Sequence, residues 1–253
     1  MSQLKALIFD VDGTLSDTER DGHRIAFNRA FADANLDWCW DVETYGVLLK
    51  ITGGKERIRH FIENFQAVFS VPADLDGFIK DLHQSKTNHY VALLKSGAIP
   101  LRPGVERLLS EARSANLRLG IATTTTPENV TTLLNATLGA ESIGWFDVIA
   151  AGDVVPDKKP APDIFQYALN AMDISAEDCM AFEDSENGLL SSLQAGLKTI
   201  VTVNDYTRNN SFDGAIIVLD QLGEPGEAFT VIDGDAGGAG YVDVPLIKRL
   251  FET

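Results

Sequence analysis

Short apolar runs alternate along this chain with longer stretches in which apolar residues recur every three or four positions. The runs are continuous rather than alternating, which is typical of strands buried on both faces of a parallel sheet. They are ALIFD at 6–10, LRLGIATT at 117–124, FDVIAAGD at 146–153, CMAFED at 179–184, KTIVTV at 198–203 and GAIIVLD at 214–220. Helical stripes at 105–112, 130–138 and 164–172 separate several of them. This order predicts an α/β fold with a Rossmann-like, doubly wound parallel sheet.

One region interrupts the alternation. From about residue 16 to about residue 97 the chain has only helical periodicity, such as Ile58, Phe61, Ile62 and Phe65. A simple crossover between parallel strands needs roughly a dozen residues, so this longer stretch predicts an inserted α-helical domain. We therefore expect a catalytic core at 1–14 and 99–253 and a helical cap at 15–98. The segment DGDAGGAG at 233–240 lies between two short apolar runs and predicts an edge hairpin without an assigned function.

Composition limits the classes of partner and compartment. The formal charge of −16 over 253 residues argues against nucleic acid or an anionic membrane as a partner, because both need clustered lysine and arginine. Two cysteines, Cys39 and Cys179, cannot form a disulfide framework. The start MSQLKALIFD has no signal-peptide pattern, and no apolar run has membrane-spanning length. We expect a cytoplasmic protein, and the sequence leaves its oligomeric state open.

Polar residues follow four of the predicted strands at their carboxyl ends, where open α/β sheets bind ligands. They are Asp10, Asp12, Thr123, Thr124, Lys159, Glu183 and Asp184. One polar strand end is ordinary loop chemistry, but the strand order would bring these carboxylates, hydroxyls and lysine together. Their convergence predicts a site for an anionic substrate and a cation.

Phosphoryl transfer through a carboxylate and Mg²⁺ uses this combination of groups. Magnesium prefers hard oxygen ligands, which Asp10 and Asp184 would supply, and the cation would offset the repulsion between them. An aspartate can also act as nucleophile and form an aspartyl-phosphate, while a second carboxylate moves the proton of the leaving oxygen. Asp10 and Asp12 suit these two tasks, with Thr123 and Lys159 holding the transferring oxygens.

These motifs resemble those of the haloacid dehalogenase superfamily. The similarity lies in the ordered set DVDGTL at 10–15, GIATT at 120–124, KKPAPD at 158–163 and FEDSENG at 182–188, and it spans nearly the whole chain. The resemblance implies that Asp10 is the nucleophile and Asp12 the general acid and base, and that Thr123, Thr124 and Lys159 bind phosphate. It also implies Mg²⁺ held by Asp10, the backbone carbonyl of Asp12 and Asp184, with Glu183 either as a further ligand or as a residue that supports the ligands.

The helical insertion is similar to the cap of CbbY-type phosphatases, a group associated with carbon fixation. The resemblance rests on SDTERDGHRIAFNRAF at 16–31 and WDVETYGVLLKITGGKERIRHF at 40–61. It implies a small phosphorylated sugar as substrate, namely xylulose 1,5-bisphosphate, a by-product that inhibits Rubisco. It also implies substrate contacts from Glu19, His23, Tyr45, Gly53, Gly54, Lys55 and Arg57. In an acidic chain, the paired glycines and basic residues of TGGKERIRH suit a phosphate site.

Alternatives remain open at this point. The sequence GGKER could be only a turn that opens a solvated helix, SDTE at 16–19 fits a capping box, and His23 could serve packing. A β-phosphoglucomutase would use the same aspartyl-phosphate. A dehalogenase would not need Asp12, and a receiver-like phosphorylation switch would need no large insertion. The sequence favours a phosphoric monoester hydrolase over these rivals.

Overall fold

The computed structural model describes residues 3–66 and 69–253, which divide into two compact units. The first unit comprises Met1–Asp17 and Pro100–Thr253, and the second is the intervening segment Thr18–Ile99. The segments that join them pair within the first unit, where the backbone N–H of Arg102 donates to the carbonyl of Leu15 at 2.9 Å.

The first unit is built on a seven-stranded sheet in the order β3-β2-β1-β4-β5-β6-β7. The strands are β1 (Ala6–Phe9), β2 (Arg118–Thr123), β3 (Val148–Ala151), β4 (Cys179–Glu183), β5 (Lys198–Thr202), β6 (Ile217–Leu219) and β7 (Val231–Asp233). Neighbouring strands from β1 to β6 are parallel, and β7 is antiparallel to β6. The predicted Rossmann-like α/β fold is confirmed.

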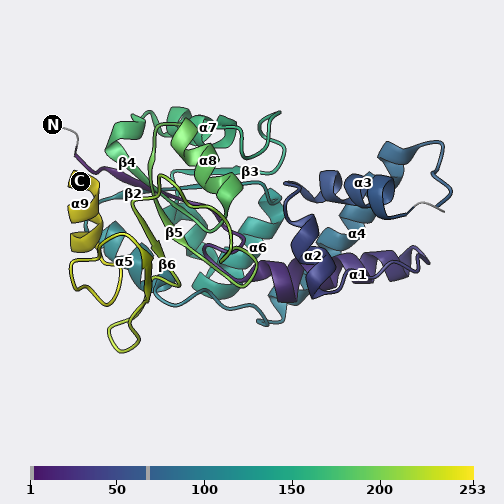
Figure 1. Cartoon of the computed structure of the whole chain (residues 1–253), viewed down its shortest axis with the longest axis horizontal. Coiled ribbons are helices and arrows are strands. Elements are labelled where there is room, and N and C mark those ends of the chain that lie inside the picture. Colours follow the sequence, from purple (N-terminus) through teal and green to yellow (C-terminus); the bar gives the residue numbers. More distant parts are fainter. Residues whose placement is uncertain (1–2, 67–68) are drawn as a thin grey trace. The chain divides into compact units, whose positions relative to one another are not determined.

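Helices cover the sheet because its central strands are apolar on both faces. All four residues of β1 are buried, and Ala6 and Ile8 pack with Phe165 of α7 (Asp163–Met172) in one apolar cluster. Figure 1 shows α7 and α8 (Glu186–Gln194) above the sheet, and α5 (Val105–Ser114) and α6 (Pro127–Leu138) below it. The stripes predicted at 105–112, 130–138 and 164–172 lie in α5, α6 and α7. Two-sided burial thus explains the continuous apolar runs.

The parallel register aligns the carboxyl ends of the central strands. Phe9 of β1 lies beside Ile121 of β2 on one side and Phe182 of β4 on the other. The backbone N–H of Asp10 continues this pairing and donates to the carbonyl of Phe182 at 3.0 Å. The residues that follow β1, β2 and β4 therefore meet at one edge of the sheet.

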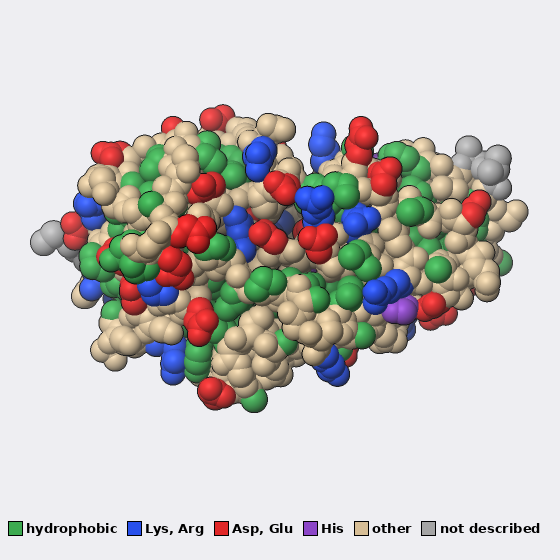
Figure 2. All heavy atoms as spheres, turned by 90° about the horizontal axis from the view of Figure 1, so that it is seen from below, with side chains coloured by type: hydrophobic (Ala, Val, Ile, Leu, Met, Phe, Trp, Pro, Cys, Tyr) green, Lys and Arg blue, Asp and Glu red, His purple; other side chains and the backbone are tan. Residues whose placement is uncertain are grey.

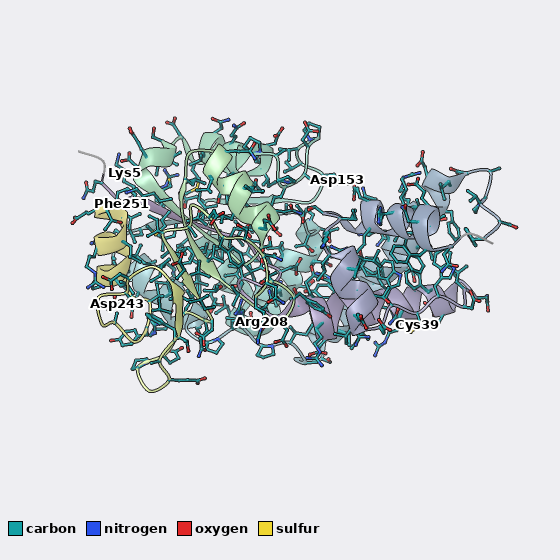
Figure 3. The ribbon with its side chains drawn as sticks, viewed as in Figure 1. Lys5, Cys39, Asp153, Arg208, Asp243 and Phe251 are labelled. Atoms are coloured by element: carbon teal, nitrogen blue, oxygen red, sulfur yellow. The ribbon has the colours of Figure 1, made fainter. Side chains whose placement is uncertain are left out.

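The C-terminal tail differs from the expected hairpin. The apolar run before the glycine-rich segment forms β7, which pairs with β6, but the run after it forms helix α9 (Val244–Glu252). Asp243 caps this helix by accepting a hydrogen bond from the N–H of Leu246 at 2.8 Å (Figure 3). The apolar positions of α9 recur at helical spacing and are buried, so helix packing decides its conformation.

The second unit is helical. Its elements are a π-helical segment (Glu19–His23), α1 (Arg24–Asp33), α2 (Val42–Leu48), α3 (Gly54–Phe65) and α4 (Leu75–Lys95). Its core is aromatic: the Phe27 and Trp40 ring centroids lie 4.6 Å apart, and Trp38 contacts Phe31 at 5.4 Å. The tryptophans that flank Cys39 are thus buried packing residues, whereas Cys39 itself is exposed.

One face of the molecule mixes acidic and basic side chains. On the face drawn in Figure 2, lysine and arginine side chains lie among aspartate and glutamate side chains rather than in one basic patch. Among the described residues, no helix is both long enough and apolar enough to cross a membrane.

Candidate active site

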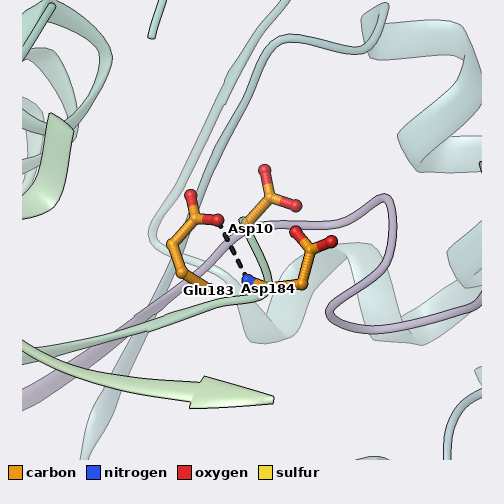
Figure 4. Close-up of side chains that lie close together, drawn as sticks. All are labelled: Asp10, Glu183 and Asp184. Atoms are coloured by element: carbon orange, nitrogen blue, oxygen red, sulfur yellow. Dashed lines mark hydrogen bonds between the residues drawn. The ribbon is translucent and has the colours of Figure 1, made fainter. Parts of the chain in front are cut away.

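Three carboxylates converge at the carboxyl edge of the sheet. Asp10 follows β1, Glu183 is the last residue of β4, and Asp184 follows it (Figure 4). One oxygen from each lies within 4.8 Å of the others, and all three side chains are buried. Strand register produces this convergence, since β1 and β4 are neighbours in the sheet.

Lys159 joins the cluster from the loop that follows β3. Its Nζ donates to Asp10 at 2.7 Å, to Glu183 at 2.6 Å and to the backbone carbonyl of Ala122 at 2.8 Å. Burial alone would lower the pKa of Lys159, but the carboxylates of Asp10 and Glu183 outweigh burial and raise that pKa above its ordinary value. The lysine therefore carries its positive charge while it contacts Asp10.

One lysine does not neutralise three carboxylates. Burial raises the pKa of Asp10 to about 7, although the nearby Lys159 opposes this shift. Burial also raises the pKa of Asp184, and the charges of Glu183 and Asp10 add to the effect. A divalent cation would favour the ionised forms, and buried carboxylate oxygens are the ligands that Mg²⁺ prefers. The donor set thus fits the metal that the sequence predicts.

Glu183 differs from the other two carboxylates in its partners. Its Oε1 accepts a hydrogen bond from Lys159 at 2.6 Å, and its Oε2 accepts one from the backbone N–H of Asp184 at 3.1 Å. Both oxygens are therefore engaged by groups of the protein. This arrangement suits a residue that holds Lys159 and the Asp184 backbone in place beside the cluster.

The predicted residues from β1 and β2 lie at the same edge. Thr123 ends β2 and is buried, and its Oγ1 accepts a hydrogen bond from the backbone N–H of Thr125 at 3.3 Å. Thr124 is half-buried in the turn that follows. Asp12 is half-buried two residues beyond Asp10, and its negative charge acts on the pKa of that residue. Register therefore gathers the predicted core residues near the carboxylate cluster.

Three predicted cap residues form a network within the second unit. Tyr45 is fully buried in α2, and its hydroxyl donates a hydrogen bond to the carboxylate of Glu19. Arg57 of α3 donates from its guanidinium to the Tyr45 hydroxyl at 3.0 Å and to the carbonyl of Leu48 at 3.2 Å. A buried arginine, phenol and carboxylate thus share one connected set of hydrogen bonds.

The alternative role for Glu19 as part of a capping box is wrong. Thr18 precedes the π-helical segment without a side-chain capping bond, and the Ser16 hydroxyl donates instead to the carbonyl of Pro100. The side chain of Glu19 turns toward Tyr45 because the tyrosine hydroxyl is a donor that burial requires to be paired.

The glycine pair opens α3, but the helix is not a simple solvated one as the GGKER alternative supposes, because Arg57 is buried. Gly53 has a φ of +96°, and a Cβ on Gly54 would lie 2.5 Å from Nε2 of His83 in α4. Lys55 is half-buried in the first turn of α3. His23 is buried and stacks on Tyr90 with ring centroids 3.9 Å apart. His23 thus has the packing contact that the alternative describes, and this contact does not exclude a role in substrate binding.

Sequence reasoning missed two residues of the first unit. Arg102 is buried, and it donates hydrogen bonds to the backbone carbonyls of Gly13, Thr202 and Val203. Asn204 follows β5 and donates to Asp184 at 2.6 Å. The position of Asn204 just after an apolar run was a usable signal, whereas nothing in the pattern LRPG indicated that Arg102 would be buried.

Comparison with known proteins assigns the family. The model of the haloacid dehalogenase-like hydrolases matches residues 4–196. The chain belongs to the haloacid dehalogenase-like hydrolases. It is 46% identical over 224 residues to protein CbbY, plasmid, of Cupriavidus necator, covering 88% of this chain and 88% of that protein.

Two solved structures extend the likeness of this haloacid dehalogenase-like hydrolase. CbbY from Rhodobacter sphaeroides in complex with phosphate is 46% identical, with a TM-score of 0.81, and the match covers 87% of this chain and 95% of the other. A mutant of CbbY from Rhodobacter sphaeroides in complex with xylulose-(1,5)bisphosphate is 47% identical, with a TM-score of 0.80 and the same coverage. The predicted enzyme class, a phosphatase, is confirmed.

Proposed function

We propose that this enzyme is a Mg²⁺-dependent phosphatase that removes one phosphate from xylulose 1,5-bisphosphate. The observation that carries the proposal is the buried cluster of Asp10, Glu183, Asp184 and Lys159 at the carboxyl edge of the sheet. The choice of substrate is supported by the 47% identity to a CbbY structure in complex with that bisphosphate.

Asp10 is the proposed nucleophile. An oxygen of its carboxylate attacks the phosphorus, the bond from phosphorus to the sugar oxygen breaks, and an aspartyl-phosphate forms. Asp12 donates a proton to the departing sugar oxygen. It then takes a proton from the water that attacks the aspartyl-phosphate, which returns Asp10 as a carboxylate and releases inorganic phosphate.

The surrounding groups balance the charge of the transferred phosphate. Lys159, which contacts Asp10 at 2.7 Å, and the hydroxyls of Thr123 and Thr124 would hold its oxygens. Asp10, the Asp12 backbone carbonyl and Asp184 would hold Mg²⁺, with Glu183 beside them, and the cation supplies positive charge where negative charge develops. Glu183 keeps Lys159 charged and in place.

The second unit is the proposed cap, and it would select the sugar. Glu19, Tyr45 and Arg57 already share hydrogen bonds, so a substrate could exchange these contacts for its own. Backbone amides at Gly53 and Gly54 and the cation of Lys55 lie at the start of α3, where a helix favours an anion. His23 completes the proposed substrate-contacting set.

The decisive experiment measures phosphate release from a panel of sugar monophosphates and bisphosphates with Mg²⁺ present. We expect xylulose 1,5-bisphosphate to give the highest kcat/KM, and Asp10→Asn to abolish turnover on every substrate. A preference for monophosphates would contradict the choice of substrate alone. Formation of an isomeric sugar phosphate without net phosphate release would instead favour the mutase alternative, and a stable phosphoprotein without turnover would favour the switch.

A further inference from the structure

Asn204 reaches the carboxylate cluster from the loop after β5, the strand beside β4. Its amide Nδ2 donates a hydrogen bond of 2.6 Å to Oδ2 of Asp184. This contact engages one oxygen of Asp184 and leaves Oδ1 for a cation. Asn204 is half-buried, and its amide lies beside the cluster formed by the three carboxylates.

A tight turn fixes the orientation of the Asn204 amide. Its Oδ1 accepts a hydrogen bond from the backbone N–H of Tyr206 at 2.9 Å, and its own backbone N–H donates to Oγ1 of Thr207 at 3.0 Å. Rotating the amide by half a turn would set its oxygen against Asp184 and its NH₂ against an N–H donor. The donor is therefore held toward Asp184 before any metal binds.

Two further residues hold this hydrogen bond in place. A Cβ on Gly13 would lie 2.3 Å from Oδ2 of Asp184 and 2.7 Å from Nδ2 of Asn204, so the Gly13 backbone packs directly against both atoms. The Arg102 guanidinium donates to the carbonyls of Gly13 and Val203. It thereby connects the loop after Asp10 with the loop that carries Asn204.

We propose that Asn204 is a positioning residue that fixes the carboxylate of Asp184 for Mg²⁺ binding. By holding Oδ2, it limits rotation of the carboxylate and directs Oδ1 to the cation. Groups that orient a metal-ligating carboxylate in this way typically contribute about 10- to 100-fold in metal affinity. This inference rests on the proposed function, because it assumes that Asp184 binds Mg²⁺.

The test is to titrate Mg²⁺ into the protein without substrate and to measure the Kd by isothermal titration calorimetry. Asn204→Ser is the informative variant, since its hydroxyl can accept the Tyr206 N–H and keep the turn but is too short to reach Asp184. We expect its Kd for Mg²⁺ to rise about 10- to 100-fold. The exposed Asn209→Ala, in the same loop, is the matched control and should bind like the unmodified protein.

Turnover gives a second measurement. If Asn204 only stabilised its loop, kcat would fall and would not recover at saturating Mg²⁺. In Asn204→Ser, the Mg²⁺ concentration for half-maximal phosphate release should rise with the Kd, while kcat largely recovers at saturating Mg²⁺. Asn204→Ala removes both the donor and the turn, and it should bind Mg²⁺ no better than the serine variant.

The outcomes separate this role from the proposed function. Unchanged Mg²⁺ affinity in Asn204→Ser would mean that Asn204 only closes its turn, and so would a loss confined to the alanine variant. Unmodified protein that hydrolyses sugar phosphates without binding Mg²⁺ would overturn both this role and the metal dependence. If Mg²⁺ binds as expected but no sugar phosphate is hydrolysed, the proposed function fails while the role of Asn204 stands.

Discussion

At the scale of single residues, Asp10 and Asp12 divide the proposed chemistry between them. Asp10 is buried against Lys159, whereas Asp12 is half-buried at the turn that follows. A proton donor needs access to the departing oxygen and to water, so greater exposure suits the acid and base. In the proposed mechanism, the buried residue of the pair is the nucleophile and the more accessible one carries the proton.

Replacing Asp12 by Asn should lower kcat by about 10²- to 10⁴-fold, because the amide cannot transfer the proton. Phosphate release under saturating substrate measures the effect. The loss should be smaller on p-nitrophenyl phosphate, whose leaving group needs little protonation. Equal losses on both substrates would argue that Asp12 acts in positioning or in metal binding rather than in protonating the leaving oxygen.

Lys159 forms buried ion pairs with Asp10 and Glu183 in addition to its proposed contact with phosphate. Lys159→Ala would leave Asp10 and Glu183 without their shared cation, and removing one partner of a buried ion pair costs about 3 to 5 kcal/mol. We expect the free energy of unfolding of the metal-free protein to fall by about that amount in urea titrations. The matched control is Lys158→Ala, whose partner Asp153 is exposed.

Those two lysines should therefore behave differently. Lys158→Ala should change the free energy of unfolding by less than about 1 kcal/mol, as an ion pair with an exposed partner does. If Lys159→Ala were as stable as Lys158→Ala, the buried ion pairs of Lys159 would contribute no more to stability than the pair of Lys158 with Asp153, which would contradict this prediction.

At the scale of elements, the start of α3 carries the residues proposed to recognise the second phosphate of the substrate. Gly53, Gly54 and Lys55 present amides and a cation at a helix N-terminus, and Arg57 follows one turn later as a buried donor. Arg59, by contrast, pairs with Asp76 and is the least suited of the local basic residues to bind a substrate. Within α3, Lys55 and Arg57 are therefore the candidates for substrate binding, whereas Arg59 forms a surface ion pair.

Lys55→Ala or Arg57→Ala should lower kcat/KM for xylulose 1,5-bisphosphate by about 10- to 100-fold, equivalent to one charge-assisted contact. Turnover of p-nitrophenyl phosphate, which has one phosphate, should change less. Arg59→Ala is the control from the same helix and should leave both substrates unaffected. Parallel losses on both substrates would indicate that Lys55 or Arg57 maintains the helical unit rather than reading a second phosphate.

At the scale of the whole molecule, charge makes a bound cation important. The chain has a formal net charge of −16, so an anionic sugar phosphate gains no long-range attraction from the protein as a whole. Local positive charge must then capture it, and in the first unit Lys159 is already shared by Asp10 and Glu183. A dication at the carboxylate cluster would supply the remaining attraction.

Removing divalent metal should stop turnover. Excess chelator should abolish phosphate release, and added Mg²⁺ should restore it, because the three buried carboxylates otherwise repel the substrate. Ca²⁺ should restore little activity, since its larger and looser coordination disturbs in-line attack. The same titration should show Mg²⁺ raising the melting temperature of the protein, as a ligand of the folded state does. Full activity in chelator would contradict a catalytic metal.

The sequence by itself indicated strands β1 to β6, helices α5 to α7 and the polar residues near the strand ends. Continuous apolar runs can be recognised because burial on both faces removes polar positions, and their alternation with helical stretches favours a parallel sheet. The polar residues at strand ends could therefore be named in advance, from Asp10 to Asp184. The conformation of the tail was harder to predict, because a short apolar run such as that of α9 is compatible with either a helix or a strand.

Only the tertiary structure decided which of those polar groups contact one another. Lys159 reaches Asp10 across 149 positions of sequence, and Arg102 reaches Val203 across 101, and no local pattern encodes either distance. The partner of Glu19 proved to be Tyr45 rather than a helix end for the same reason. The apolar composition of a strand indicates that the strand is buried. The partner of a buried polar side chain, however, depends on how distant segments pack.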